Sequence, residues 1–487
     1  MMASSPSILL LLIYLSSSTL PSLVSPSPPS TDHITISLDQ HKPPSSQDPL
    51  ETLAQVAKSS LARAKHLKKP NPHTSSSSTP LSPQSYGGYS ISLRFGTPPQ
   101  PIPFILDTGS DLVWFPCTHR YLCRDCPKAS KPTPSFIPKL SHSSKLIGCR
   151  NPKCLWIHSS PDLLSRCDKS CHPPHYNINH NNPKFSNTNT IVRRDTNNCT
   201  QLCPPYLVLY GSGSTGGVLL SETLSLPGKS YPDFALGCSL FSSRAPSGIA
   251  GFGRGPASLP SQLRLTKFSY CLVSHRFDAA NKSSSLDLAI SGGTGKTPAT
   301  AYTKFLPNPT VGNPAFGVYY YLALRRISIG GVQVKIAAKY LSPQPDGNGG
   351  VIVDSGTTFT VMEGPVFEPV AREFVKQVEN RYKRLRGVEG RVGLSPCFNV
   401  SGAKDVTFPK LVLHFKGGAD MELPSPNFIA FVGRESDVVC MTVSTVGGDE
   451  GEGVSGPAVI LGNHLMQNFY VEYDLMNNRF GFRRQVC

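Results

Sequence analysis

The feature that most constrains the fold is a motif that occurs twice in the 487 residues, at 104–114 and at 351–361. Each copy consists of an apolar run that ends in Asp, followed by a small hydroxyl residue, Gly and a second hydroxyl residue. Downstream of each copy lies a short apolar–apolar–Gly segment, which ends at Gly251 in the first half and at Gly462 in the second. A pattern repeated at this scale predicts an internal duplication, with two pseudo-symmetric lobes.

The rest of the chain is typical of a mainly β protein. Gly (41) and Pro (46) are both frequent, which suits short strands joined by turns better than long helices. Strands are expected, for example, at 319–329 and 411–415. The main helix is expected at 365–386, with Pro365 in its first turn and Gly387 just past its end. We therefore expect an all-β, bilobed fold with a few short helices.

The N-terminus indicates a secreted protein. An apolar run at 8–15 is followed by small and polar residues, and it is far shorter than the roughly 20 residues that span a bilayer. We expect a signal peptide at 1–25 and a removable prosegment at 26–83, which is rich in Ser, Pro and His. Within the prosegment, residues 49–69 predict a basic amphipathic helix. A disordered leader that is not processed is the alternative.

The folded body is expected to begin near Tyr86, where apolar and polar residues start to alternate. The repeat then places an N-terminal lobe at 84–278 and a C-terminal lobe at 279–487. The spacing from Asp to the downstream Gly is 251 − 107 = 144 residues in the first lobe and 462 − 354 = 108 in the second. A Cys-rich insertion at 117–203 explains the excess in the first lobe.

The repeated motif has a chemical logic. Gly109 and Gly356 let the chain turn sharply and bring backbone N–H groups close to the carboxylates of Asp107 and Asp354. The hydroxyl groups of Ser110 and Thr357 are placed to hydrogen-bond the outer carboxylate oxygens. A lone Asp of this kind would more often be a turn or cap residue, but two matched copies favour a common site.

Two such loops that meet across a pseudo-dyad would bring Asp107 and Asp354 into contact. Two like charges so close cannot both ionise readily, so the pair shares a proton over a wide pH range. The ionised carboxylate can then take a proton from a bound water while the protonated one donates to a scissile carbonyl oxygen. Because the titration belongs to the pair, neither Asp is assigned permanently as the acid. This chemistry needs no metal, no cofactor and no covalent intermediate.

From about Tyr86 to Cys487 the chain resembles the pepsin-like aspartic proteases, and most closely their plant nepenthesin-type branch. The resemblance rests on the two Asp motifs and on further short segments at 95–100, 210–214, 251–256, 268–272 and 460–463. It implies that Tyr210 is a flap tyrosine on a hairpin over the cleft, and that Trp114 hydrogen-bonds it. It also implies a cleft that binds an extended protein or peptide substrate. We expect a monomer that binds no nucleic acid and, once the signal is removed, no membrane.

The 14 cysteines predict a disulfide framework, as is usual in an oxidising compartment. Zinc binding within the insertion is an alternative that its irregular spacing does not favour. The resemblance implies a set of pairs, with Cys117–Cys123 and Cys167–Cys171 left over. The implied pairs are Cys149–Cys203, Cys154–Cys199, Cys126–Cys238, Cys271–Cys487 and Cys397–Cys440.

Positive charge is concentrated in two places. Between Thr118 and Pro205 there are 13 Lys or Arg and 4 Asp or Glu, a surplus of nine out of the net +16. This surplus could contact acidic polymers or substrates, or simply aid solubility. The prosegment helix carries a second basic group just upstream of an acidic site. We hypothesise that one of its cations lies across the cleft and pairs with the two Asp; the candidates are Arg63, Lys65, Lys68 and Lys69.

The leading function is an aspartic endopeptidase that acts at acidic pH. The rival is a catalytically inactive relative that binds or inhibits other proteins, and a zinc-binding extracellular module would leave the repeat unexplained. We expect an extracellular location, in the apoplast or cell wall, with the vacuole as the alternative. Three sequons, Asn198, Asn281 and Asn399, are candidate glycosylation sites.

Overall fold

The structure is a computed structural model of the whole chain. The residues that it describes are 33–40, 48–69, 88–126, 134–158, 201–210, 213–245, 247–274, 284–291, 295–309, 311, 313–432, 437–446 and 456–487. The expected signal peptide, Asn198, Asn281 and the Cys167–Cys171 pair lie outside these residues.

The two copies of the repeated motif fold into matching strand arrangements. In the first, β3 (Gln100–Asp107) runs parallel to β10 (Gly248–Gly251), which also pairs antiparallel with β4 (Trp114–Pro116). In the second, β17 (Val351–Val353) runs parallel to β26 (Val459–Leu461), which also pairs antiparallel with β18 (Thr360–Glu363). In each half, the central strand, β10 or β26, therefore has one parallel and one antiparallel neighbour. The predicted duplication is confirmed.

Most of the remaining structure is also β-sheet, and the expected all-β architecture is confirmed. The largest sheet of the described residues contains fifteen strands, in the order β13-β28-β27-β11-β12-β1-β2-β3-β10-β4-β9-β8-β6, with β5 beside β9 and β7 beside β8. Its strands not yet bounded are β1 (His33–Gln40), β2 (Tyr89–Phe95), β5 (Leu122–Arg124), β6 (Lys145–Leu146), β7 (Tyr206–Tyr210), β8 (Gly213–Leu226), β9 (Lys229–Ser243), β11 (Lys267–Cys271), β12 (Ser284–Ala289), β13 (Ala301–Lys304), β27 (Phe469–Asp474) and β28 (Arg479–Arg484).

Three smaller sheets of the described part of the chain belong to the C-terminal half. The first has the order β14-β17-β26-β18-β25, the second β16-β15-β21-β22 and the third β19-β20-β24-β23. Their other strands are β14 (Tyr320–Leu322), β15 (Leu324–Ile329), β16 (Val332–Gln333), β19 (Lys383–Arg384), β20 (Cys397–Asn399), β21 (Leu411–Phe415), β22 (Asp420–Leu423), β23 (Ile429–Val432), β24 (Val438–Met441) and β25 (Val443–Val446). The strands expected at 319–329 and 411–415 are therefore present.

The helices among the described residues are few and mostly short. They are α1 (Pro49–Lys68), α2 (Pro152–Ile157), α4 (Leu259–Leu263), α5 (Ala338–Leu341), α6 (Gly364–Val378) and α7 (Arg386–Val392), with 3-10 turns η1 (Pro138–Leu140), η4 (Pro314–Val318), η5 (Ser425–Asn427) and η6 (Asn463–Met466). The prediction of a single helix at 365–386 is wrong, because α6 ends at Val378, the last position of its buried face. The chain then turns and pairs β19 with β20, and Gly387 lies inside α7.

The described residues before position 70, called the leader from here on, are built into the fold. Strand β1 lies between β12 and β2 and pairs antiparallel with both. Its side chains alternate between buried and exposed, with Ile34, Ile36 and Leu38 buried. The expected prosegment contained only a helix, so this strand was missed, although the alternation that marks it is visible in the sequence.

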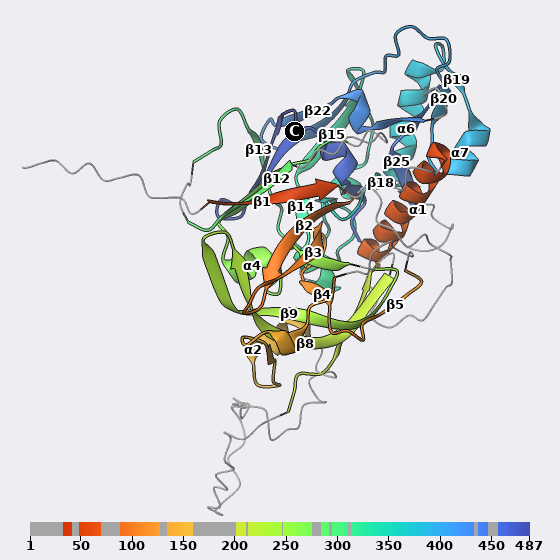
Figure 1. The fold of residues 1–487 in the computed structure, drawn as a ribbon. Helices are drawn as coiled ribbons and strands as arrows, with labels where there is room; N and C mark the ends of the chain where they lie inside the picture. Colours follow the sequence, from red (N-terminus) through yellow and green to blue (C-terminus); the bar gives the residue numbers. More distant parts are fainter. Residues whose placement is uncertain are drawn as a thin grey trace, which may run out of the picture.

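The leader helix α1 confirms the helix expected at 49–69. Asp48 caps its N-terminus by accepting a hydrogen bond from the Leu50 N–H, and Pro49 occupies the first turn. Its apolar face, which includes Leu53, Val56 and Leu67, is buried. The helix packs against β18, β25, α7 and β23 of the C-terminal half, as the red ribbon beside α7 in Figure 1 shows. The leader is therefore docked rather than disordered.

Five disulfides link described residues, and only two of the expected pairs are among them, Cys271–Cys487 and Cys397–Cys440. The other expected pairs that the described residues test are wrong. The structure instead contains Cys117–Cys238, Cys123–Cys126 and Cys154–Cys203, and Cys149 is also disulfide-bonded. These bonds use six cysteines of the insertion or its flanks, which excludes those six as thiolate ligands for zinc.

Strand register explains the pairing of Cys117. Strand β4 runs parallel to β9 with Phe115 opposite Cys238, and the Cys117 N–H donates to the Ser239 carbonyl. The two Cα atoms of Cys117 and Cys238 are therefore 5.1 Å apart, a normal disulfide separation. Cys126 is left to bond its neighbour Cys123 within the same loop.

Candidate active site

The carboxyl groups of Asp107 and Asp354 meet where the two lobes join. Asp107 is the last residue of β3, and Asp354 directly follows β17. Both are almost completely buried, at 2% and 0% exposed. A Cβ atom added to Gly356 would lie 2.4 Å from Asp107 Oδ1, and one added to Gly109 would lie 2.7 Å from Asp354 Oδ1. Glycine is therefore required at both positions, because each turn passes directly over the opposite carboxyl group.

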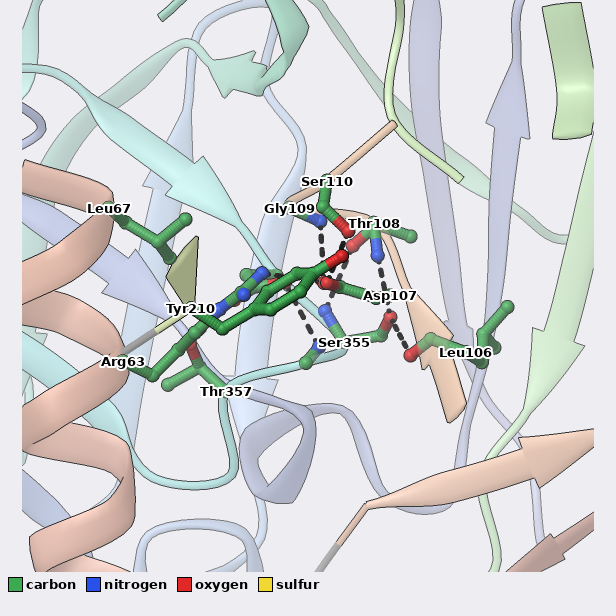
Figure 2. Close-up of polar contacts among 12 residues, drawn as sticks. Arg63, Leu67, Leu106, Asp107, Thr108, Gly109, Ser110, Tyr210, Ser355 and Thr357 are labelled. Carbon is green, nitrogen blue, oxygen red and sulfur yellow. Dashed lines mark hydrogen bonds and ion pairs between the residues drawn. The ribbon is translucent and has the colours of Figure 1, made fainter. Parts of the chain in front are cut away.

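The two carboxyl groups have the same set of hydrogen bonds. Asp107 Oδ1 accepts from the Gly109 N–H at 3.0 Å, and its Oδ2 accepts from the Ser110 hydroxyl at 2.5 Å. Asp354 Oδ1 accepts from the Gly356 N–H at 3.0 Å, and its Oδ2 accepts from the Thr357 hydroxyl at 2.6 Å. These contacts are the ones expected from the motif, and they fix both carboxyl groups in one orientation (Figure 2).

A second symmetric set of hydrogen bonds joins the two loops beneath the carboxyl groups. The Thr108 N–H donates to the Ser355 hydroxyl at 3.0 Å, and the Ser355 N–H donates to the Thr108 hydroxyl at 2.9 Å. The Ser355 hydroxyl in turn donates to the Leu106 carbonyl at 2.9 Å. The prediction of the site from the repeated motif includes no role for these two residues. The signal was present, since the small residue directly after Asp carries a hydroxyl group in both copies.

Arg63 of the leader helix reaches both carboxyl groups. Its Nη2 lies 2.7 Å from Asp107 Oδ1 and its Nε lies 3.3 Å from Asp354 Oδ2, and Figure 2 shows the side chain extending from the helix into the site. Of the four candidate cations, Arg63 is thus the one that pairs with the two Asp. Although burial opposes its charge, the two carboxyl groups raise the pKa of Arg63 further above its ordinary value. The guanidinium therefore stays protonated at any pH of interest.

The electrostatics of Asp107 combine opposing effects. Burial raises its pKa, the Arg63 guanidinium lowers it, and the neighbouring Asp354 raises it again. The net result is a pKa raised to about 6. Asp107 can therefore take up a proton in mildly acidic solution even while the leader is docked, which weakens its ion pair with Arg63.

Tyr210 lies near Asp107, and Trp114 packs against Tyr210. Tyr210 ends β7, which forms an antiparallel hairpin with β8, and its hydroxyl accepts a hydrogen bond from Trp114 Nε1 at 2.9 Å. Figure 2 shows the Tyr210 ring beside Arg63 and Asp107. The hydrogen bond that the resemblance implied is present, and the tip of the hairpin, residues 211–212, is outside the described residues.

The described residues contain no group of three or more His, Cys, Asp or Glu side chains that could bind a metal ion. Across the same part of the chain, the helices are all too short or too polar to cross a membrane.

Comparison with known proteins places this geometry in a family. Two family models match, one described as xylanase inhibitor N-terminal over residues 89–288 and one as xylanase inhibitor C-terminal over residues 319–484. A probable aspartyl protease of Arabidopsis thaliana is 36% identical over 440 residues, covering 84% of this chain and 84% of its own. The aspartic proteinase nepenthesin-1 of Nepenthes gracilis is 32% identical over 410 residues, covering 82% of this chain and 78% of its own.

Solved structures show the same fold at low sequence identity. The crystal structure of edgp has a TM-score of 0.60 at 17% identity and covers 95% of this chain and 97% of its own. That of conglutin gamma from lupine seeds has a TM-score of 0.57 at 16% identity and covers 93% and 95%. Together with the two Asp-hydroxyl-Gly-hydroxyl loops, these relatives show that the chain belongs to the pepsin-like aspartic protease family, in its nepenthesin-type branch.

Proposed function

We propose that this protein is an aspartic endopeptidase, synthesised as an inactive precursor, that hydrolyses extended protein substrates at acidic pH. The observation that carries the proposal is the symmetric pair Asp107 and Asp354, each held by a backbone N–H and a hydroxyl group, with a leader cation between them. A site arranged in this way holds two carboxyl groups in fixed orientations on either side of the place that Arg63 occupies.

The chemistry follows from a shared proton. With the leader removed, a water between the carboxyl groups would face one ionised and one protonated group. The ionised carboxylate takes a proton from the water, the oxygen attacks the scissile carbonyl carbon, and the protonated carboxyl group donates to the carbonyl oxygen. The tetrahedral diol then collapses: one of its hydroxyl groups returns a proton to the carboxylate that had donated, the other carboxyl group protonates the amine nitrogen, and the C–N bond breaks. Ser110 and Thr357 keep both groups oriented throughout, and Tyr210 on its hairpin covers the reacting bond.

The leader supports an inactive precursor. Arg63 occupies the space between the carboxyl groups that a water and a scissile carbonyl would need, and it neutralises the charge that would activate the water. Acid protonates Asp107 and weakens the ion pair, so the same condition that favours the shared-proton state also favours release of the leader.

The second candidate is a catalytically inactive protein that binds or inhibits other proteins. The descriptions of both matching family models, xylanase inhibitor N-terminal and C-terminal, favour it. A binding protein, however, has no need for two intact, symmetric carboxyl loops together with a tyrosine–tryptophan hydrogen bond above them. We therefore favour the enzyme.

The deciding experiment measures cleavage of a denatured protein mixture between pH 3 and 7. Wild-type protein is compared with Asp107→Ala and Asp354→Ala, with and without a statine inhibitor. Acid-dependent cleavage that the inhibitor blocks and both variants lose supports the enzyme. If folded, leader-free wild-type protein cleaves nothing, the binding protein becomes the better hypothesis.

The proposed location is extracellular, with the vacuole as the alternative. The five disulfides between described residues support a passage through an oxidising compartment. The proposed partner is a protein or peptide substrate, bound to a monomeric enzyme.

A further inference from the structure

A second leader cation lies in a buried site of its own. Lys68, at the end of α1, forms an ion pair with Glu363, the last residue of β18, and its Nζ also lies 3.1 Å from the Pro457 carbonyl oxygen. The side chains of Lys68 and Glu363 are only 9% and 3% exposed. Removing the leader would therefore leave a negatively charged carboxylate at the surface that α1 now covers.

The leader contacts only one of the two oxygens of the Glu363 carboxylate. Lys68 contacts Oε1, whereas Oε2 is buried and has no hydrogen-bond partner among the described residues. A carboxylate can accept two parallel hydrogen bonds from a guanidinium, so the group has capacity beyond one ammonium. Burying an ion pair is costly, and a contact that served only to hold the leader could be made more cheaply with apolar side chains.

The Glu363 site and the carboxyl pair are contacted by two cations of one helix. Lys68 is five residues after Arg63, which places it about 7.5 Å further along the helix axis and about 140° around it, so the two side chains leave the helix in different directions. Side chains on one face of an extended peptide are about 6.6 Å apart, since each residue rises about 3.3 Å. A substrate whose scissile bond sits at the carboxyl pair can thus bring a nearby side chain to Glu363.

Tyr319 supports this placement. Its hydroxyl donates to the Leu67 carbonyl at 3.2 Å, and it lies close enough to Arg63, Asp354 and Asp107 to interact with their charges. The backbone at Leu67–Lys68 is therefore bound beside the carboxyl pair through a contact that a substrate carbonyl could also make.

An apolar surface adjoins the acidic site. Leu67, which Figure 2 shows projecting from the same helix as Arg63, is 1% exposed. It belongs to a buried cluster with Ala64 and residues of the C-terminal half; these are Phe316, Tyr319, Tyr321, Ile352, Val361 and Ile460. With α1 gone, an apolar side chain of a substrate could occupy the place of Leu67.

We propose that Glu363 determines substrate specificity by binding a lysine or arginine side chain of the substrate near the scissile bond, next to an apolar side chain. The leader residues Leu67 and Lys68 fill these two positions in the precursor and leave them when α1 is released. The inference rests on the proposed function for its reaction, but the binding preference can be measured without any turnover.

The test uses full-length protein that is folded, cut within residues 41–47 and within residues 70–83 at introduced sites for a foreign protease, and freed of α1 by gel filtration in acid, so that β1 stays in the sheet. Peptides that differ only by lysine or norleucine, placed at each position in turn, are assayed at pH 5. Cleavage gives kcat/KM, and calorimetry with an Asp107→Asn background gives Kd. The Glu363→Gln protein also carries Lys68→Met, so that the replacement does not leave a buried cation unpaired in the precursor.

At one peptide position we expect lysine to be preferred over norleucine by at least about tenfold, the factor that corresponds to about 1.4 kcal/mol. Glu363→Gln should reduce this ratio to within about twofold and leave the norleucine peptide unaffected. Glu363→Lys, with Lys68→Glu to keep the precursor pair, should prefer a glutamate peptide instead. Glu368→Gln, an exposed position on α6, is the matched control and should behave as the parent.

The outcomes separate the two proposals. Cleavage with no lysine preference, or with a preference that survives Glu363→Gln, overturns the specificity site and leaves the protease intact. Binding that depends on lysine and Glu363 without any cleavage supports the site and refutes the enzyme. Loss of both binding preference and cleavage overturns both.

Discussion

Replacing Arg63 by alanine tests whether the ion pairs of Arg63 with Asp107 and Asp354 hold the leader helix over the site. Arg63 is 8% exposed and contacts both Asp107 and Asp354, so the change leaves two buried carboxyl groups without their cation. Removing one partner of a buried ion pair costs about 3–5 kcal/mol. The two carboxyl groups can relieve part of this by sharing a proton, so we expect the lower end, about 3 kcal/mol. The lost free energy weakens the docking of α1 rather than the two Asp loops, because Thr108 and Ser355 join these loops independently of the leader.

A weakening of about 3 kcal/mol corresponds to a roughly hundredfold larger population of precursor with α1 released. Amide hydrogen exchange across residues 49–68, measured at pH 7 by mass spectrometry, should therefore accelerate by about that factor. Lys65→Ala is the control, since Lys65 is exposed on the same helix. If exchange in Arg63→Ala stays within about threefold of wild type, the ion pairs do not hold the leader and the reasoning is refuted.

The pH dependence gives a second readout. Arg63 lowers the pKa of Asp107, so release of the leader lets the carboxyl pair bind a proton more tightly. Docking is therefore strongest above the pKa of the released pair, which is higher than the docked value, and the contribution of the ion pair is lost as the pH falls through the docked pKa of about 6. In Arg63→Ala this acid-induced release should flatten, and the onset of cleavage activity should move to higher pH. An unchanged onset would contradict the mechanism.

Three further changes test other contacts. Ser355→Ala removes the acceptor for the buried Thr108 N–H and should lower the unfolding free energy by about 1–3 kcal/mol in urea; a change below about 0.5 would show that the interlobe bonds are dispensable. Tyr210→Phe removes the hydroxyl that accepts the indole N–H and should reduce kcat/KM up to about tenfold, with the melting temperature nearly unchanged; equal activity would argue against a role over the site. Burial raises the pKa of Glu389, but hydrogen bonds from Arg384 lower it, so the net pKa lies below its ordinary value. Glu389→Gln should therefore destabilise the protein at pH 7, and the destabilisation should disappear as the pH falls below about 4. A destabilisation that does not depend on pH would show that the charge of Glu389 does not stabilise the fold.

The candidate site could be predicted from the sequence because its chemistry is local. Asp, hydroxyl, Gly and hydroxyl follow one another, so the contacts of Asp107 and Asp354 arise within four residues of chain. The Arg63 ion pair could be anticipated only as one of four cations, because the rotation of a helix about its axis depends on what it packs against.

The errors concern contacts between distant segments. Cys117 bonds Cys238 because β4 and β9 pair in one particular register, which spacing along the chain does not encode. The end of α6 at Val378 depends on β19 pairing with β20 across the following turn. Strand β1 is a different case, since its alternation was readable but it stands in a segment whose composition favours a disordered leader.

Because strand β1 is part of the leader, removal of the leader affects the large sheet as well as the inhibition of the site. It separates β12 from β2, so the strands on its two sides are hydrogen-bonded to each other only through a piece of the leader. Excising the whole leader would open a strand-wide gap and expose two rows of unpaired backbone groups, which invite aggregation. A cut within residues 41–47, between β1 and α1, would instead allow α1 to be released and leave β1 in place as a short second chain. Where the precursor is cut thus decides whether the mature protein has a continuous sheet or a slot that another strand must fill.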